Sequence, residues 1–287
     1  MHLQHDRAAV LLDRGGVDFI DVSNPLEPKV IDRYRRESDL TNWSGVRILD
    51  DRFTLIYGDD GAELLQKGEL KIDQAARWDV AEIGPIRSVA AYDSRTVFMA
   101  GEKGLWALRL NQRPLMPHRL LDGDFVGVEA RHPYVYVVRP DRVEVATAKH
   151  LLRHLTGTKL PLGSFRARRV RVAGDSLFLF AKGHVAEVSI ADAQNPRVVA
   201  LLKAEDTGRL NDVATSNGRM YLLGNRGLQI AGPQAKWISD AIQVSANKRM
   251  QLRGRFAFLV GGKTFEIIDL APYQDDSAAA APAPNGS

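Results

Sequence analysis

Residues 96–108 read Thr96-Val97-Phe98-Met99-Ala100-Gly101-Glu102-Lys103-Gly104-Leu105-Trp106-Ala107-Leu108, two apolar runs joined by a turn with glycine at both ends. Short apolar runs bounded by turn residues are typical of buried strands. Glycine permits the tight reversal between them because it has no Cβ atom to restrict the backbone. The stretch therefore predicts a β-hairpin whose strands are buried on both faces.

The same strand–turn–strand pattern recurs seven times along the chain, about every 40 residues. The first strands of the seven hairpins are predicted at Ala8–Asp13, Phe53–Tyr57, Thr96–Ala100, Tyr134–Val138, Ser176–Phe180, Met220–Leu223 and Phe256–Val260. A period of this length indicates an array of units, each of which buries a face against the next.

Each unit has room for four strands. From the second unit on, a strand with a recurring Val or Met precedes the hairpin, at Val46, Val89, Val128, Val170, Val213 and Met250. A more polar strand follows several hairpins, at Lys29–Tyr34, Glu69–Ala75, Arg197–Lys203 and Ala235–Ile242. Seven units of four antiparallel strands predict an all-β, seven-bladed β-propeller, whereas an open solenoid would need shorter repeats.

Several segments depart from this regular ring. Met1 aligns with the recurring Val, and the last unit ends after its third strand, Thr264–Leu270, so we expect the ring to be incomplete between its first and last blades. Lys149–Leu155 predicts a helical turn or a distorted outer strand in blade 4. We expect one propeller domain over residues 1–273 and a disordered Ala/Pro-rich tail over 274–287.

The composition excludes several classes of protein and of functional site. The chain has 287 residues, 45% of them hydrophobic, with a mean hydropathy of −0.22, and no apolar run approaches the length of a membrane span. It has no cysteine, which excludes disulfides, thiolate zinc sites and cysteine nucleophiles. The net charge of +4 favours anionic partners, although a solvated surface of mixed charge is the simpler interpretation.

The segment Gly16-Val17-Asp18-Phe19-Ile20-Asp21-Val22-Ser23-Asn24-Pro25-Leu26-Glu27-Pro28 resembles the repeat of the LVIVD family of bacterial and archaeal β-propellers. His184–Pro196 is a degraded copy, and Glu266–Leu270 is a fragment of one. The resemblance implies an exported or surface-associated protein without an assigned activity, and it supplies no catalytic residues. The incomplete seam suggests a precursor trimmed of an export signal, which would place the protein in the periplasm or at the cell surface. Without such a signal the protein would be cytoplasmic.

The innermost strands of a propeller line a central channel, and their first residues are expected near its mouth. Alignment on the recurring Val brings six candidate site residues toward the axis, Arg47, Arg87, Arg169, Arg171, Asp212 and Arg249, with Glu129 beside them. Converging guanidinium groups bind carboxylate or phosphate groups well, so the set predicts an anion site. Alternatively, these charges pair with one another or with water in the channel.

Other candidate sites are weaker. His150 and His154 have zinc-ligand spacing but no third ligand, so surface histidines are the simpler interpretation. Asp59, Asp60 and Glu63 fit no known calcium loop. We predict no metal and no cofactor.

Two further sequence features allow a functional interpretation. Trp43 could stack on a ligand or pack between blades. The basic stretch of residues 166–171 alternates between two strand faces without aromatic residues, so no nucleic-acid partner is predicted.

Two hypotheses for function remain. In the first, the chain is a non-enzymatic scaffold whose loops bind a protein partner in an envelope-associated complex. In the second, it is a propeller enzyme or small-ligand binder that recognises an anionic ligand through the channel arginines. No Gly-x-Ser-x-Gly nucleophile motif or other catalytic set occurs in the sequence, which favours the first hypothesis.

Overall fold

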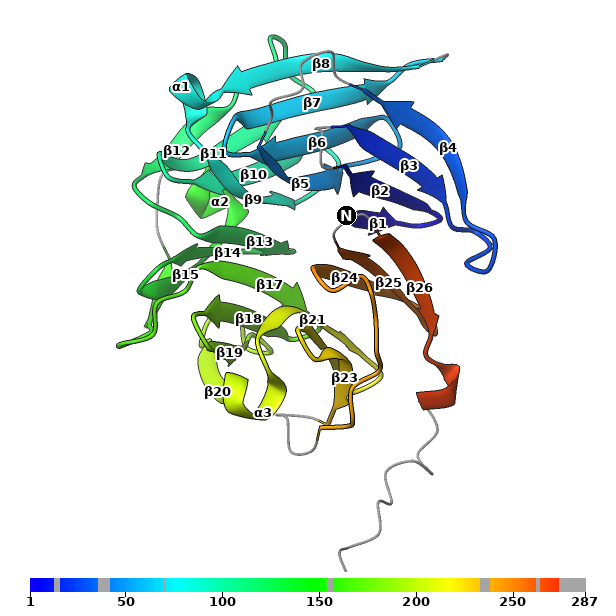
Figure 1. The fold of residues 1–287 in the computed structure, drawn as a ribbon. Coiled ribbons are helices and arrows are strands. Elements are labelled where there is room, and N and C mark those ends of the chain that lie inside the picture. Colours follow the sequence, from blue (N-terminus) through cyan, green and yellow to red (C-terminus); the bar gives the residue numbers. More distant parts are fainter. Residues whose placement is uncertain are drawn as a thin grey trace, which may run out of the picture.

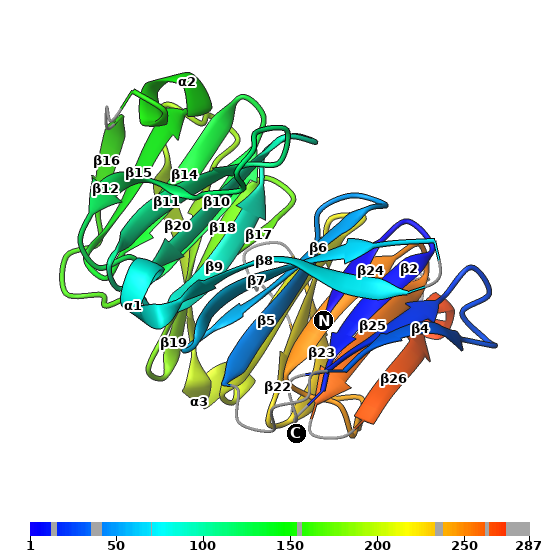
Figure 2. The same cartoon turned by 90° about the horizontal axis from the view of Figure 1, so that it is seen from above.

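The fold is a ring of seven antiparallel sheets around a central axis (Figure 1). The computed structural model describes residues 1–12, 16–35, 42–69, 71–153, 157–232, 238–261 and 264–273. Figure 2 shows the ring from its side, with the sheets standing next to one another as blades. The predicted all-β seven-bladed propeller is therefore confirmed. No described helix is long and apolar enough to cross a membrane.

Blades 1 to 5 each contain four strands that pair in chain order. Blades 1 and 2 consist of β1 (His2–Gln4), β2 (Arg7–Leu11), β3 (Val17–Asp21), β4 (Lys29–Tyr34), β5 (Trp43–Ile48), β6 (Phe53–Gly58), β7 (Gly61–Lys67) and β8 (Ile72–Asp79). Blades 3 and 4 consist of β9 (Ile86–Ala91), β10 (Thr96–Gly101), β11 (Gly104–Arg109), β12 (His118–Asp122), β13 (Gly127–Arg131), β14 (Tyr134–Arg139), β15 (Arg142–Thr147) and β16 (Thr158–Pro161).

Blade 5 consists of β17 (Arg169–Ala173), β18 (Ser176–Ala181), β19 (His184–Ser189) and β20 (Arg197–Lys203). Blades 6 and 7 have three strands each in the described part of the chain. Blades 6 and 7 consist of β21 (Leu210–Ser216), β22 (Arg219–Gly224), β23 (Gly227–Ala231), β24 (Arg249–Arg253), β25 (Phe256–Gly261) and β26 (Thr264–Asp269). The short helices are α1 (Val80–Ile83), α2 (Ala148–Leu151), α3 (Ala204–Thr207) and the 3-10 turn η2 (Ala271–Tyr273).

The hydrophobic core lies between the blades, which explains why their middle strands are apolar at consecutive positions. In β10, Val97 and Met99 pack in a cluster with residues of blade 2. Phe98, between them in sequence, packs with Val135 and Val137 of blade 4. A strand buried on both faces needs apolar side chains on both, so the alternation typical of half-buried strands is lost.

Glycines at the hairpin turns are required by close packing. A Cβ atom on Gly58 would lie 2.2 Å from the carbonyl oxygen of Asn42, in the loop that leads into the innermost strand of the same blade. Gly61, at the other end of the turn, has φ +99, and its Cβ would lie 2.2 Å from the carbonyl oxygen of Trp78. The recurring turn sequence therefore serves the architecture.

The turn that carries the family resemblance ends strands by local hydrogen bonds, as the sequence predicts. The Asp21 carboxylate accepts a hydrogen bond from the Ser23 N–H at 2.8 Å, and Asn24 Oδ1 accepts one from the Leu26 N–H at 3.2 Å. In blade 5, Asp192 accepts one from the Gln194 N–H at 3.0 Å. Such side-chain acceptors compete with the strand ladder and stop it.

Of the two alternatives predicted for residues 149–155 of blade 4, the helical turn is confirmed for residues 149–151, which belong to α2; residues 154 and 155 lie outside the described chain. The prediction of a regular fourth strand over Ala235–Ile242 in blade 6 is wrong for its described part. Ile238 and Ile242 form isolated bridges with Ala231 and Leu228. The outer segment has one more residue between these bridges than β23 has, and such a bulge interrupts the ladder.

The seam between blades 1 and 7 is incomplete, as predicted. β1 has three residues, and β26 has no fourth strand beside it in the described chain. The two blades share no strand among the described residues and are held by side chains instead. Arg253 donates hydrogen bonds to the carbonyl oxygens of His5 at 3.0 Å and Val22 at 3.1 Å, and it forms an ion pair with Asp6. The predicted tail, residues 274–287, lies outside the described residues.

Candidate functional site

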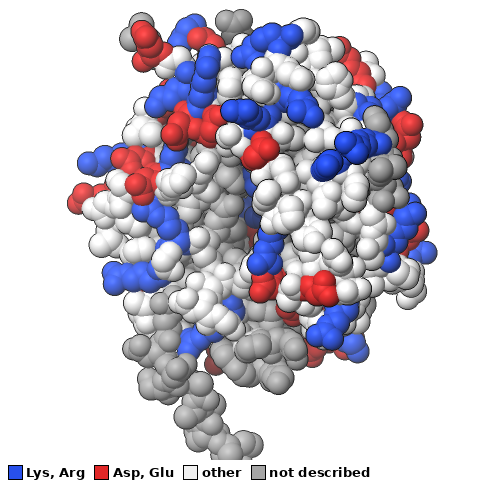
Figure 3. Space-filling view, turned by 180° about the vertical axis from the view of Figure 1, so that it is seen from behind, with Lys and Arg blue, Asp and Glu red and all other residues white. Residues whose placement is uncertain are grey.

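The two faces of the ring differ in their loops. We call one the mouth face: it carries the loops that lead into the innermost strands and the turns between second and third strands. The helices α1 and α3 lie on the mouth face and α2 on the opposite one (Figure 2). On the opposite face, basic and acidic side chains lie interspersed (Figure 3), and Arg131 pairs there with Asp175.

A buried ion pair holds the innermost strands of blades 5 and 6 together. Arg171 donates from Nε to Asp212 Oδ1 at 3.0 Å and from Nη2 to Oδ2 at 3.1 Å. The N–H of Met250, in blade 7, donates to the same carboxylate at 2.9 Å. Burial disfavours the charge of Asp212, but the Arg171 guanidinium outweighs it and lowers the pKa of this carboxyl. The pair therefore links three blades.

Further polar contacts near the axis join other neighbouring blades. Ser88 Oγ donates to the carbonyl oxygen of Val128 at 2.9 Å, and the Ile48 N–H donates to His2 Nδ1 at 3.2 Å. Glu129 is buried and accepts a hydrogen bond from the backbone N–H of Val172; burial raises the pKa of its carboxyl. Burial, with a smaller contribution from Arg47, lowers the pKa of His2 to about 2. These residues form a structural belt around the channel.

The predicted site arginines differ in their partners. Arg87 pairs with Glu102 at 2.7 Å and Asp124 at 2.5 Å, so these two carboxylates neutralise its charge. The side chains of Arg47 and Arg249 form no ion pair or hydrogen bond with any described residue, and Arg47 Nε is buried without an acceptor among them.

In the number of its partners, Arg169 is intermediate between Arg87 and Arg249. It donates to the carbonyl oxygen of Asn211, and its guanidinium lies 4.1 Å from the centre of the Phe180 ring. Burial and the neighbouring Arg249 both lower the pKa of Arg169. Its positive charge is therefore poorly compensated by the protein.

The structure brings five of the six predicted residues around one cavity in the channel. This cavity is lined by Arg47, Arg87, Arg169, Arg171 and Arg249, together with Glu129. Asp212, the sixth, lies behind Arg171. The cavity volume is about 50 Å³, which admits only a few water molecules. A ligand larger than that must bind outside the narrow part of the channel.

A larger hollow of about 450 Å³ lies at the mouth of the channel. Its lining includes Arg169, Lys248 and Arg249 beside Asn211 and Trp43. Lys248 is exposed and forms no ion pair among the described residues. Three cations converge on a space that can hold a carboxylate or phosphate group, and we call it the mouth hollow.

Sequence reasoning missed the aromatic residue beneath Arg169. Phe180 is the direct cross-strand partner of Arg169 in the β17–β18 ladder. Side chains of directly opposed residues lie on one face of a sheet, so the register of the predicted hairpin could have identified this contact.

The remaining sequence candidates do not form sites. His150 is exposed on α2, and His154 lies outside the described residues. No group of metal-binding side chains occurs in the part of the chain that the structure describes. Glu63 is buried and bonds to the Tyr34 hydroxyl, away from the turn that holds Asp59 and Asp60. Trp43 packs in the core between blades 1 and 2, as one of its two interpretations predicted.

Comparison with known proteins shows the fold. No family model and no curated protein matches the chain in sequence. PorZ, an essential bacterial surface component of the type IX secretion system of Porphyromonas gingivalis, is similar to 88% of the chain with a TM-score of 0.59 and 17% identity. The chain spans 34% of the length of PorZ. The WD40 β-propeller domain of Doa1 is similar to 80% of the chain, over 83% of its own length, with a TM-score of 0.55 and 13% identity. At these identities the likeness establishes a β-propeller.

Proposed function

We propose that this chain is a non-enzymatic interaction scaffold that binds a protein partner on its mouth face. The observation that carries the proposal is the mouth hollow, where Arg169, Lys248 and Arg249 converge and form no ion pair with any described residue. Unpaired cations around a concave surface attract acidic groups of a partner and set its orientation. The rigid ring holds the loops of seven blades in fixed relative positions, which suits recognition of a folded partner.

Cross-linking and affinity capture from native cells test this proposal. Wild type is compared with Lys248→Glu/Arg249→Glu on the mouth face and with Arg95→Glu, an exposed arginine on the opposite face. We expect wild type and Arg95→Glu to recover the same stoichiometric partner, and the mouth-face variant to lose it. Equal recovery by all three proteins would refute binding at the mouth hollow. If none recovers a stoichiometric partner, the scaffold role is wrong.

We further propose that the scaffold works in an envelope-associated complex, in the periplasm or at the cell surface. Support comes from the likeness to PorZ, a surface component of a secretion system, and from the turn at Asp21–Asn24 that resembles the LVIVD repeat. Fractionation of native cells tests the location: the chain should appear with periplasmic or surface markers. Recovery with cytoplasmic markers alone would overturn it.

The second candidate function is binding of a small anionic ligand at the channel mouth. It is favoured by Arg249 and Arg169, which line both the channel cavity and the mouth hollow. Thermal shift with phosphate, citrate and other anions tests it. Arg249→Gln should abolish any stabilisation, whereas Arg87→Gln, whose side chain is already paired, should retain it. If no anion stabilises wild type, this candidate is rejected.

A further inference from the structure

A turn of blade 5 separates two hollows on the mouth face. It comprises residues Ala181–His184, between β18 and β19. The hollow toward blade 6 has a volume of about 460 Å³ and is bounded by α3. Its floor is apolar and is formed by Phe180, Val185, Leu202 and Leu210. A concave apolar floor of this size can take one or two large side chains.

The second hollow lies toward blade 4 and has a volume of about 480 Å³. Its apolar lining includes Leu162, Phe165, Val198 and Leu201. Val198 and Leu201 are each 49% exposed although they are large and apolar. They belong to β20, the outermost strand of its blade. Exposed apolar side chains gathered in a hollow mark an interaction site rather than scattered surface residues.

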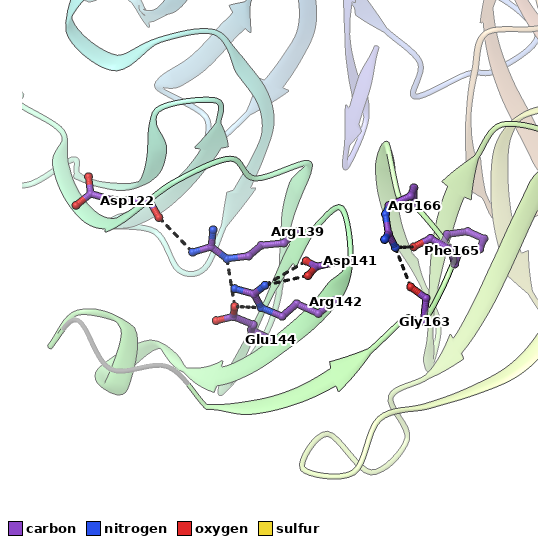
Figure 4. Close-up of polar contacts among 8 residues, drawn as sticks. All are labelled: Asp122, Arg139, Asp141, Arg142, Glu144, Gly163, Phe165 and Arg166. Atoms are coloured by element: carbon purple, nitrogen blue, oxygen red, sulfur yellow. Dashed lines mark hydrogen bonds and ion pairs between the residues drawn. The ribbon is translucent and has the colours of Figure 1, made fainter.

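Cations without acidic partners surround both hollows. Arg168 and Lys182 line both of them, Arg166 lines the second and Arg209 the first. None of these four side chains forms an ion pair with a described residue. Arg166 donates only to carbonyl oxygens, those of Gly163 at 2.7 Å and Phe165 at 3.2 Å (Figure 4).

Two acidic residues close in sequence offset the charge of these four cations only in part. Glu205 and Asp206 lie on α3 beside the first hollow, but neither lines it. The carbonyl oxygens of these two residues, not their carboxylates, accept the hydrogen bonds that Arg226 donates at 3.3 and 3.0 Å. The surface around the blade 5 turn is therefore positive.

The neighbouring blade shows the opposite arrangement. Arg139 and Arg142 share the carboxylate of Glu144 at 3.2 and 2.7 Å, and Arg142 also bonds to Asp141 at 3.1 Å (Figure 4). These arginines lie on the turn that corresponds, in blade 4, to the Ala181–His184 turn of blade 5. The unpaired charge is therefore a local property of the blade 5 surface and does not merely reflect the net charge of the chain.

We propose that the two hollows form one docking surface for an acidic segment of a protein partner. Apolar side chains of the segment enter the hollows, and its carboxylates pair with Arg168, Lys182 and Arg209 across the turn. Apolar anchors that alternate with charged contacts give such a surface its affinity and fix the orientation of the bound segment. This inference rests on the proposed scaffold function and specifies the chemistry of the partner.

Two other anionic surfaces fit less well. A lipid bilayer is flat, whereas the apolar floor lies recessed between the turn and α3, so acyl chains would not reach it. Single-stranded nucleic acid needs accessible aromatic rings for its bases. Phe180 is only 6% exposed and is covered by the Arg169 guanidinium, and Phe165 in the second hollow is partly buried, so the two hollows offer no row of accessible phenyl rings. An acidic polypeptide is the partner that can both fill the hollows and neutralise their rim.

Selection from a random 12-residue peptide library displayed on phage tests the proposal with the whole chain as bait. We expect the selected peptides to be enriched in Asp and Glu together with Leu, Phe or other large apolar residues. Lys182→Glu should weaken their binding at least tenfold, and Val198→Ser/Leu201→Ser should weaken it several-fold. All three positions are exposed, so these variants should fold. Arg95→Glu makes the same charge change as Lys182→Glu on the opposite face and should bind as wild type does.

The proposed docking surface is refuted if the selected peptides are not enriched in acidic residues, or if Lys182→Glu leaves their binding unchanged. It is also refuted by Lys182-dependent binding of phosphatidylserine vesicles or an oligothymidylate in place of acidic peptides. The capture experiment separates this failure from failure of the scaffold role. A native partner lost by Lys248→Glu/Arg249→Glu but retained by Lys182→Glu refutes only the blade 5 surface. If wild type recovers no partner at all, the scaffold role fails as well.

Discussion

Arg171 and Asp212 face each other as a two-pronged ion pair across the junction of blades 5 and 6. Asp212 has no exposed surface, and the Arg171 side chain retains 22% exposure. Because Asp212 raises the pKa of Arg171 and neutralises it, this arginine is committed to the ring. The cations that remain for a ligand are those without such a partner among the described residues, above all Lys248 and Arg249 at the mouth hollow.

Removal of one partner of this pair should destabilise the fold. Asp212→Asn leaves the Arg171 guanidinium, which keeps 22% exposure, without its hydrogen-bonded carboxylate, and we expect a loss of about 3–5 kcal/mol in the free energy of unfolding. The double variant Arg171→Met/Asp212→Leu should lose less, because neither charge of the pair stays buried without the other. Urea denaturation of the three proteins measures both effects. An unchanged midpoint for Asp212→Asn would show that the pair does not support the ring.

Removal of the Glu129 charge should stabilise the fold, in contrast to removal of the Asp212 charge. Burial raises the pKa of its carboxyl, so the ionised form costs stability at pH values above the pKa of the unfolded chain. Glu129→Gln keeps an acceptor for the Val172 N–H and should raise the unfolding free energy at pH 7. Below about pH 4 the side chain is protonated in both states, so the gain should vanish. A destabilised Glu129→Gln protein at pH 7 would show that the charge itself supports the belt.

His2 should make stability depend on pH in the weakly acidic range. Its Nδ1 accepts the Ile48 N–H, and its pKa in the folded state is about 2 against 6.5 for the unfolded chain. The unfolded state therefore takes up a proton first, and stability falls as the pH drops below 6.5, by at most about 1.4 kcal/mol per pH unit. Urea titrations between pH 7.5 and 4.5 should show a shallower fall for His2→Gln. His184→Gln, at an exposed histidine, should follow wild type.

The turn glycines should be intolerant of side chains. A Cβ atom on Gly101 would lie 2.0 Å from the carbonyl oxygen of Pro85. Gly101→Ala must therefore displace backbone, at a cost of about 3 kcal/mol. Gly183, in the equivalent turn of blade 5, has φ +78 but open space around it, so Gly183→Ala should cost only about 1 kcal/mol of backbone strain. Melting temperatures in the order wild type, Gly183→Ala, Gly101→Ala would support this account, and equal values for the two variants would contradict it.

Sequence reasoning predicted the architecture well because each blade repeats one physical solution. A strand such as Thr96–Gly101 is buried on both faces, and its apolar run is visible without any knowledge of its neighbours. Alternation also placed Arg169 and Arg249 correctly beside the axis, since they flank the recurring Val170 and Met250. The irregular outer segment of blade 6 was missed because one extra residue between Ile238 and Ile242 breaks the ladder without a marked signal in composition.

The partners of the candidate site residues could not be predicted in the same way. Arg87 and Arg249 both lie at the start of an innermost strand, yet one is neutralised by described residues and the other is not. The difference comes from Glu102 and Asp124, which lie in turns and loops whose course the repeat does not fix. The first hollow of blade 5 likewise depends on the distance between the Ala181–His184 turn and α3, and no local sequence pattern encodes that distance.

The seam between blades 1 and 7 has a consequence for how the gene can be rearranged. Each described sheet is built from one continuous stretch of chain, and Arg253 joins the two end blades without exchange of a strand. A chain reopened in the loop between any two blades and joined at the old seam would keep every sheet intact. Circular permutants at such surface loops are generally tolerated. No strand pairing among the described residues therefore depends on which blade comes first in the chain.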